Sequence, residues 1–389
     1  MEITEVETHL IGSETDHAVD RWLFVRIHTD EGVIGIGEVG AWGYLEPCER
    51  AVETFARYLV GKDPLRRDHH WQYLYRNAHF RGAVLTGALS AIDIALWDIA
   101  GKHLDVPIYQ LLGGKCREKA RTYVHAFGET TEELAAECRA AEQAGFTAVG
   151  HLSPLLDEPR EEPYFETHSR LIGDAVDRVR TYREAVGDDV DLCIEMHRRL
   201  DPEQAIPLAK EIEQFRPLFY EDPVRPDNFD AMAQVAERID IPIATGERLH
   251  TPHEFGMLLR RDAVQYVRPN LGLAGGFSQV KKIAGMAEAQ HVDVVPHNPL
   301  SPVSTAAGLQ LAASIPNFGI QEFPFRPSKG EAPGEHLLEE PLDWEDGYLR
   351  IPDGPGLGIS LDEQTLSRHE HEPRTLVTRL HEDGSIVDQ

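Results

Sequence analysis

The stretch from residue 191 to residue 247 contains three short apolar runs, each with an acid near its end: DLCIEMH (191–197), LFYED (218–222) and PIATGE (242–247). The glutamates in these runs recur every 26 residues. A buried strand and the helix that follows it occupy about that length. We therefore predict that the three runs are successive parallel strands, each with a carboxylate at its carboxyl end.

Similar apolar runs lie on both sides of this stretch, with helical patterns such as 277–290 between them. Thr251-Pro252-His253-Glu254 forms a capping box with proline at the first helical position. Asp201-Pro202 starts another helix, in which Pro207 predicts a kink or a later start. The predicted strands are 121–127, 147–151, 191–197, 218–222, 242–247, 263–270, 292–297 and 318–323.

Eight strands in about 210 residues match a parallel (β/α) barrel. The alternative is a doubly wound open sheet, but the G-x-G-x-x-G spacing of Gly35–Gly40 begins within the predicted strand 33–39 and not at a turn between a first strand and a helix. We therefore predict the barrel.

The residues before the barrel read as a separate α+β module. Runs 21–29 and 33–39 flank the turn Asp30-Glu31-Gly32, which indicates a hairpin. Residues 88–102 (ALSAIDIALWDIAGK) have helical periodicity. The chain after the barrel is rich in proline and glycine, is expected to pack against this module, and ends in a polar tail from about His369. The predicted parts are 1–115, 116–325 and 326–389.

The charge balance restricts the partners of this protein. The 389 residues include 38 Lys+Arg and 66 Asp+Glu, a net charge of −28, and 41% are hydrophobic, which is enough for a core. An acidic surface repels phosphate backbones and anionic lipid, so neither nucleic acid nor membrane is an expected partner. Only eight of the basic residues are lysines, which suggests a halophilic habitat in concentrated salt.

Sorting signals and cysteine pairs are not evident. No stretch approaches the roughly 20 apolar residues that span a bilayer. The first residues, MEITEVETHL, differ from a secretory signal. Cys48, Cys116, Cys138 and Cys193 form no C-x-x-C pair. A reducing cytoplasm is the expected compartment.

The three strand-end glutamates, Glu195, Glu221 and Glu247, should meet at the mouth of the barrel. Three such carboxylates cannot all stay ionised without a cation, because like charges raise one another's pKa. Mg²⁺ suits carboxylate ligands, so a magnesium site is predicted. The alternative is three solvated acids in an acidic chain.

Two histidines and a fourth acid are predicted at the same mouth. His197 follows Glu195 by two residues, and His297 ends the seventh strand. Each alone would be an ordinary histidine among 19, but their shared position makes them candidates for proton transfer. Glu322 on the eighth strand is either a substrate ligand or a solvated acid.

Motifs along nearly the whole chain resemble the enolase superfamily, mandelate racemase subgroup, and within it the galactonate- and mannonate-type sugar-acid dehydratases. The motifs are ALSAIDIALWDIAGK, YQLLGG, IEMHRRL, YEDP, TGERLH, LAGG, HNPLSP, PNFGIQEF and GPGLGISLDE. The resemblance implies an α/β fold in which an N-terminal α+β capping domain covers a (β/α)7β TIM-like barrel. It also implies a homo-oligomer.

The resemblance further implies a Mg²⁺-dependent hydro-lyase acting on an aldonic acid. One Mg²⁺ ion would be held by Glu195, Glu221 and Glu247, although the first ligand in such proteins is often aspartate. His297 would remove the proton beside the carboxylate, and His197 would protonate the departing 3-hydroxyl. Glu322 would bond the substrate carboxylate, as part of the catalytic set. The product would be a 2-keto-3-deoxy sugar acid.

Two departures from the family pattern bear on the activity. Asn270 stands where an aspartate often pairs with the seventh-strand histidine, and Tyr164 is then a possible base, with His151 another candidate. The second strand (AVGHL) lacks the lysine pair of racemase-like and lactonising relatives, which argues against mandelate racemase or muconate cycloisomerase activity. The alternatives are a sugar-acid racemase or epimerase and a metal-dependent sugar-acid binding protein with weak turnover.

Specificity is expected to reside in loops rather than in the barrel. These loops are 11–20 and 42–45 of the capping module and the insertion 152–165 after the second strand. The sequence does not identify the sugar acid.

Overall fold

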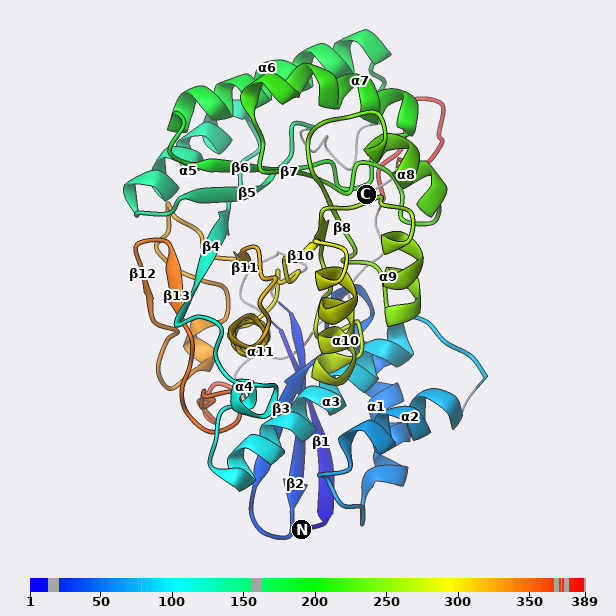
Figure 1. Cartoon of the computed structure of the whole chain (residues 1–389), viewed down its shortest axis with the longest axis vertical. Coiled ribbons are helices and arrows are strands. Elements are labelled where there is room, and N and C mark those ends of the chain that lie inside the picture. The colour runs from blue at the N-terminus through cyan, green and yellow to red at the C-terminus, as the bar shows by residue number, and fades with distance from the viewer. Residues whose placement is uncertain are drawn as a thin grey trace.

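The computed structural model describes residues 1–12, 21–77, 79–155, 163–366, 371, 373 and 378–387. Two bodies are visible in Figure 1, with the strand-and-helix barrel above and the N-terminal sheet with its helices below. The specificity loops predicted at 11–20 and 152–165, and the polar tail from His369, lie partly outside the described residues.

The N-terminal module is built on a three-stranded antiparallel sheet in the order β1-β2-β3. Its strands are β1 (Ile3–Ile11), β2 (Trp22–Thr29) and β3 (Ile34–Glu38), so the predicted hairpin is confirmed. The helices of the module are η1 (Trp42–Tyr44), α1 (Leu45–Leu59), α2 (Arg67–Asn77), α3 (Ala83–Leu104) and α4 (Ile108–Leu111).

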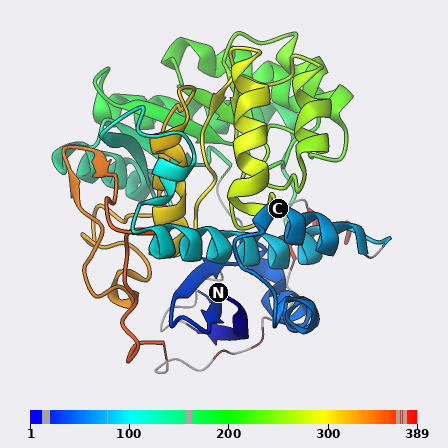
Figure 2. The same cartoon turned by 60° about the horizontal axis from the view of Figure 1, so that its bottom comes forward.

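Helix α3 joins the two bodies and runs between the sheet and the barrel in Figure 2. Among the described residues it is the one helix long and apolar enough to cross a membrane, with a mean hydropathy of 1.6 over its best window. The expectation that no stretch approaches this length is therefore wrong. Helix α3 is apolar along this length because it is buried inside the protein. Of that window, 78% is buried, and α3 packs against β3, α1 and α10.

The second body is a closed barrel of eight parallel strands, as predicted. Neighbours pair in chain order from β4 to β10, and β11 pairs with β4. A parallel bridge between Val294 and Phe318 closes the remaining gap. Its strands are β4 (Lys119–His125), β5 (Ala148–Leu152), β6 (Asp191–Glu195), β7 (Phe219–Glu221), β8 (Ile243–Thr245), β9 (Tyr266–Val267), β10 (Asp293–Val294) and β11 (Gln321–Phe323).

A helix follows each of the first seven barrel strands, which gives the (β/α)7β order. Helix α7 begins at Pro202 with a capping box at Asp201, and Pro207 lies inside it, so the later start does not occur. The helices are α5 (Thr131–Gln143), α6 (His168–Val186), α7 (Pro202–Ile212), α8 (Phe229–Ala236), α9 (Pro252–Leu259), α10 (Gly276–Glu288) and α11 (Pro302–Ser314), with short 3-10 turns η2 (Glu213–Phe215) and η3 (Glu335–Leu337).

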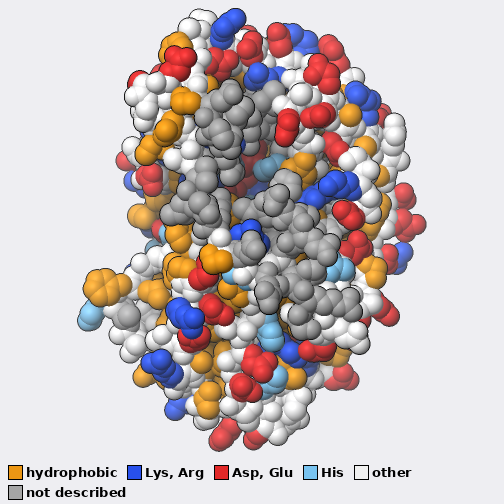
Figure 3. Space-filling model, turned by 180° about the vertical axis from the view of Figure 1, so that it is seen from behind, with side chains coloured by type: hydrophobic (Ala, Val, Ile, Leu, Met, Phe, Trp, Pro, Cys, Tyr) orange, Lys and Arg blue, Asp and Glu red, His pale blue; other side chains and the backbone are white. Residues whose placement is uncertain are grey.

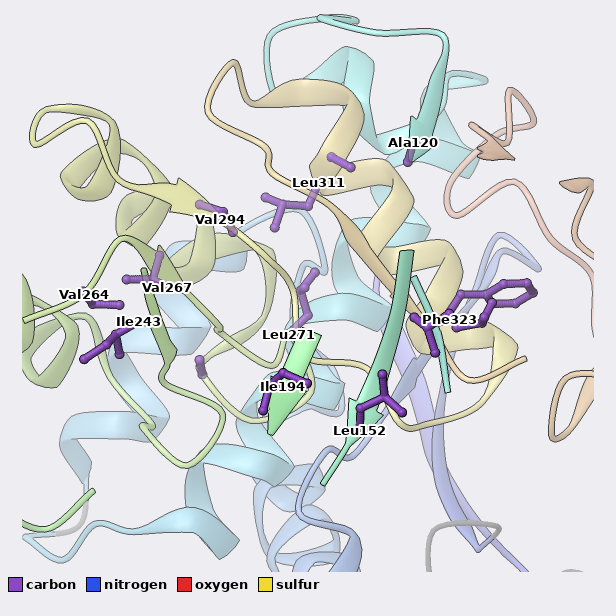
Figure 4. Packing of buried hydrophobic residues seen from close by; sticks show 14 of the residues in the cluster. Ala120, Leu152, Ile194, Ile243, Val264, Val267, Leu271, Val294, Leu311 and Phe323 are labelled. Carbon is purple, nitrogen blue, oxygen red and sulfur yellow. The ribbon is translucent and has the colours of Figure 1, made fainter. Parts of the chain in front are cut away.

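Side chains of the barrel strands alternate between two apolar layers, as the two-residue period of a strand requires. The outer layer packs against the helices, and Figure 4 shows part of it, including Leu152, Ile194, Ile243, Val267, Val294 and Phe323. The inner layer contains Tyr123, Ala148, Cys193, Phe219, Ala244, Val295 and Ile320. Residues two positions beyond the inner layer therefore point into the mouth of the barrel.

The chain after the barrel returns to both bodies. Strands β12 (Trp344–Glu345) and β13 (Tyr348–Arg350) form a hairpin, and β13 pairs antiparallel with β4. Further on, the Leu357 amide donates to Asp98 of α3 (2.8 Å), which agrees with the expected contact with the N-terminal module. We propose the division into 1–115, 116–325 and 326–389 from these contacts.

The capping box of α9 gives the first testable expectation. The Thr251 hydroxyl accepts from the Glu254 amide, and the Glu254 carboxylate accepts from the Thr251 amide at 2.8 Å. Thr251→Ala leaves one amide of the first turn without its partner, so the free energy of unfolding should fall by about 1 kcal/mol. Urea titration at pH 7 measures this change, and an unchanged midpoint would contradict it. Thr251→Ser retains the hydroxyl and is the control.

Candidate active site

The mouth of the barrel collects the charged side chains that continue the inner layer. Glu195 follows Cys193 by two residues, and Glu221 follows Phe219 in the same way. Both point inward at the ends of β6 and β7, which pair with Glu195 opposite Glu221. Glu247 lies two residues beyond the end of β8, after Gly246 turns the chain with a φ of 133°.

Glu195, Glu221 and Glu247 form one cluster, as predicted, with one oxygen of each lying within 4.8 Å of the others. Glu195 is 6% exposed and Glu221 is 2% exposed. The donors in this cluster are all carboxylate oxygens, which suit a hard divalent cation rather than a soft one. The predicted metal ligands therefore come together with chemistry that fits such an ion.

The pKa values of the cluster reflect crowding of negative charge. Burial raises the pKa of Glu221 well above its usual range, against the pull of Arg268 and with the help of Glu195 and Glu247. Burial also acts to raise the pKa of Glu195, but His151 and His197 outweigh it and lower the value. A cation between the three carboxylates would relieve the repulsion that Glu221 experiences.

Arg268 is a central residue that the sequence analysis missed. It is 1% exposed, forms an ion pair with Glu221 and donates to Glu322 at 2.5 Å and to the Tyr123 hydroxyl at 2.7 Å. Gly150 leaves room for the Tyr123 ring, because a Cβ there would lie 2.3 Å from a ring carbon. Arg268 thus links the cluster to β4 and β11. Arg268 follows Tyr266, which packs against the inner layer, by two residues, and this spacing could have placed its side chain in the mouth of the barrel.

Glu322 lies at the mouth, as predicted, and is already engaged. Its carboxylate bonds His125 Nε2 (2.8 Å) and accepts from the Asn298 amide (2.7 Å), besides the bond from Arg268. Burial would raise its pKa, yet Arg268 and the two neighbouring histidines, His297 and His125, lower it well below the usual range. Its role towards a substrate carboxylate stays a prediction.

Two histidines lie beside Glu195. Nδ1 of His151 is 2.9 Å from one carboxylate oxygen, and Nε2 of His197 is 3.9 Å from the other. His151 also stacks on His125 with ring centres 5.1 Å apart. Both have positive φ, 54° for His151 and 51° for His197, so each backbone turns at the strand end. The predicted position of His197 next to Glu195 is therefore observed.

His297 lies on another side of the cluster. Its Nε2 is 3.4 Å from Glu247, and its Nδ1 is 3.0 Å from the side-chain amide of Asn270. Because one end of an amide donates and the other accepts, Asn270 can orient either neutral tautomer of the ring. It does not supply the negative charge that an aspartate would add.

Asp222 and Arg248 form a second pair that sequence reasoning missed. The Asp222 carboxylate accepts from the Thr245 hydroxyl at 2.5 Å and from the Arg248 guanidinium, which also lies 2.9 Å from Glu247. Burial raises the pKa of Asp222 to about 6 despite Arg248. This pair fixes Arg248 against the third ligand of the cluster.

Tyr164 makes its contacts away from the three carboxylates. Its hydroxyl accepts from Arg199 (3.2 Å), and its ring lies 5.5 Å from that of His381. Its backbone bridges to His381 near the end of the described chain, and its carbonyl accepts from the Glu382 amide at 3.1 Å. Among the described residues, no contact joins Tyr164 to the carboxylate cluster.

Acidic side chains are spread over the face of the molecule seen in Figure 3, in keeping with the net charge of −28. Basic side chains are interspersed with them on that face. The expectation that nucleic acid and membrane are not partners stays a prediction.

Comparison with protein families matches the two bodies separately. Residues 4–113 match the mandelate racemase / muconate lactonizing enzyme N-terminal domain, and residues 133–365 match the enolase C-terminal domain-like family. Two similar curated proteins are D-galactonate dehydratases. That of Ralstonia pickettii is 38% identical, covering 95% of this chain and 96% of its own, and that of Xanthomonas euvesicatoria is 36% identical over both whole chains.

Solved structures agree with this comparison. An enolase superfamily member from Salmonella Typhimurium has a TM-score of 0.85 at 30% identity, covering 95% of this chain and 98% of its own. A structure from Agrobacterium radiobacter, whose description proposes a galactarate dehydratase and reports bound Na and L-malate, has a TM-score of 0.90 at 28% identity over both whole chains.

Proposed function

This chain belongs to the mandelate racemase and muconate lactonizing enzyme family of the enolase superfamily, and on that premise we propose that it is a hydro-lyase that dehydrates a sugar acid. The observation that carries the proposal is the buried cluster of Glu195, Glu221 and Glu247 with His197 and His297 beside different ligands. The finer proposal is a Mg²⁺-dependent reaction on an aldonic acid that yields a 2-keto-3-deoxy acid.

Glu195, Glu221 and Glu247 would hold Mg²⁺, which as a Lewis acid favours negative charge on the substrate carboxylate. That stabilisation is needed because the carbon beside a carboxylate is a very weak acid. His297 would accept the proton from this carbon at its ring nitrogen. We favour it over Tyr164 as the base because it contacts the cluster, whereas the Tyr164 hydroxyl bonds Arg199.

Elimination requires a second proton transfer. The electron pair left on carbon 2 expels the 3-hydroxyl, which would take a proton from His197 and leave as water. His151 lies beside the Glu195 carboxylate, as His197 does, and is close enough to orient it. The enol product then tautomerises to the 2-keto acid.

The first experiment is a screen for product. The purified protein with Mg²⁺ is incubated with C5 and C6 aldonic and aldaric acids at low and high salt, and 2-keto-3-deoxy acids are detected with semicarbazide. Product from one acid supports the proposal and identifies the substrate. Deuterium exchange at carbon 2 without product would favour epimerisation, and metal-dependent binding with neither would favour a binding protein.

Metal binding should be visible in stability as well as in activity. At about 100 times its dissociation constant, Mg²⁺ should raise the free energy of unfolding by about 2.7 kcal/mol, because it binds only the folded site. Thermal unfolding with Mg²⁺ and with EDTA measures this difference. Equal melting temperatures under both conditions would contradict a metal site at the cluster, and KCl at matched ionic strength is the control.

A further inference from the structure

Glu38 ends β3 of the N-terminal sheet, yet its carboxylate forms hydrogen bonds with residues of the barrel. The residue is 0% exposed. Its two oxygens accept four hydrogen bonds, from the amide and hydroxyl of Ser301 (3.2 and 2.6 Å) and from the amide and hydroxyl of Ser304 (3.1 and 2.6 Å). A carboxylate of one body therefore satisfies polar groups of the other.

The donors are the first turn of α11, whose N-cap is Ser301. The amides of a first turn have no partner inside the helix, and the helix dipole favours negative charge at this end. Burial raises the pKa of Glu38, while the serine bonds oppose that rise. Glu38 thus fastens the start of α11 from outside the barrel.

The start of α11 is tied in turn to His297. Only the segment Asn298–Leu300 separates His297 from Ser301. The Asn298 side chain donates to the Thr305 hydroxyl of α11 (2.8 Å), and its backbone amide donates to Glu322 (2.7 Å). A shift of the first turn would therefore move the residue next to His297.

The same strand end also contacts the partner of His297. The Gly40 amide donates to the Gly272 carbonyl at 2.7 Å. A Cβ on Gly40 would lie 2.3 Å from the Asn270 side-chain oxygen, so the backbone there passes directly against Asn270. Residues 38–40 therefore contact both loops whose side chains meet at the His297–Asn270 contact.

We infer that Glu38 is a positioning residue for His297, through which the N-terminal module sets the placement of the base. The inference takes the role of His297 from the proposed function. The contacts of Glu38 with Ser301 and Ser304 do not depend on that function. Glu38 touches neither the metal cluster nor the mouth in any described contact, so it acts through α11.

The test is Glu38→Gln, which places an amide against the Ser301 N–H while keeping size and shape. A misplacement of about 1 Å caused by a change far from the chemistry can cost about 100-fold in rate. We expect kcat to fall by about 10- to 100-fold, with KM and Mg²⁺ affinity unchanged. A fall in Mg²⁺ affinity, or an unchanged kcat, would overturn the inference.

Asp98→Asn is the matched control. Asp98 is also a fully buried acid of the N-terminal module, and accepts from the Ile36 and Leu357 amides and from Lys102, but contacts no residue of the site. It should lower stability without changing kcat. Ser304→Ala removes one of the four bonds from the other side, and it should reproduce part of the Glu38→Gln effect if the latter variant folds poorly.

Two further readouts separate this inference from the proposed function. In a His297→Asn background, Glu38→Gln should cause no further loss of turnover, because both changes act at one residue; an additive loss would contradict the inference.

Amide hydrogen exchange is the second readout and can be measured in a protein without activity. It should accelerate across residues 295–305 in Glu38→Gln and not in Asp98→Asn, so a protein without dehydratase activity still tests the contact.

Discussion

Glu221→Gln is expected to reduce turnover by at least about a thousandfold, since removing a metal ligand takes several kcal/mol of charge stabilisation from the reaction. Glu221 is the middle ligand of the cluster and is held on its other side by Arg268. Glutamine keeps the shape of the side chain, and Arg268 retains its bond to Glu322. The fold should therefore persist, while the stabilisation by Mg²⁺ disappears.

The measurement is kcat with the substrate found in the screen, together with circular dichroism and Mg²⁺ titration. Glu254→Gln is the control, because Glu254 caps α9 and contacts no member of the cluster. It should lose some stability and keep its turnover. Undiminished activity in Glu221→Gln would remove the basis for the proposed function.

His297→Asn is expected to lower kcat by about 10²- to 10⁴-fold, the usual contribution of a positioned general base. Mg²⁺ affinity should change little, because His297 lies beside Glu247 without being one of the three ligands. Asparagine removes the ring nitrogens and leaves the neighbouring loop intact. The rate of deuterium exchange at carbon 2 should fall by the same factor as product formation.

A matched variant shows whether this loss belongs to His297. His291 follows α10, away from the mouth, and has a φ of 56°, which asparagine tolerates. His291→Asn should keep full turnover.

Tyr164→Phe tests the other candidate base. Its kcat should stay within about tenfold of wild type, a smaller loss than the removal of a general base causes. A larger loss in Tyr164→Phe than in His297→Asn would assign the base to Tyr164.

The fold could be predicted from sequence because its signals are periodic. Each of the eight predicted runs overlaps a barrel strand, from β4 at 119–125 to β11 at 321–323. Glu195, Glu221 and Glu247 stood out because acids at the ends of apolar runs are conspicuous, and barrel geometry brings such ends together. These predictions depended on local pattern and on one topological rule.

Arg268, His125 and Glu38 could not be found in the same way. Arg268 and His125 lie within runs already interpreted as strands, and their importance comes from partners far along the chain, such as Glu221 and Glu322. Glu38 reads as the polar end of a hairpin strand, although it bonds a helix 263 residues later. Pairings between distant segments leave no periodic trace in a single sequence.

The order of translation places Arg268 and β13 after the three metal ligands. The three ligands emerge within 53 consecutive residues, before Arg268 and long before Arg350 of the strand that pairs with β4. Synthesis adds about 5–20 residues each second, so the three acids are made before the cation that pairs with Glu221 and before the strands β11 and β13 that pair with β4. In the folded protein Arg268 pairs with Glu221 and β11 closes the barrel against β4, so we expect the metal centre to form only after residue 323 has been made.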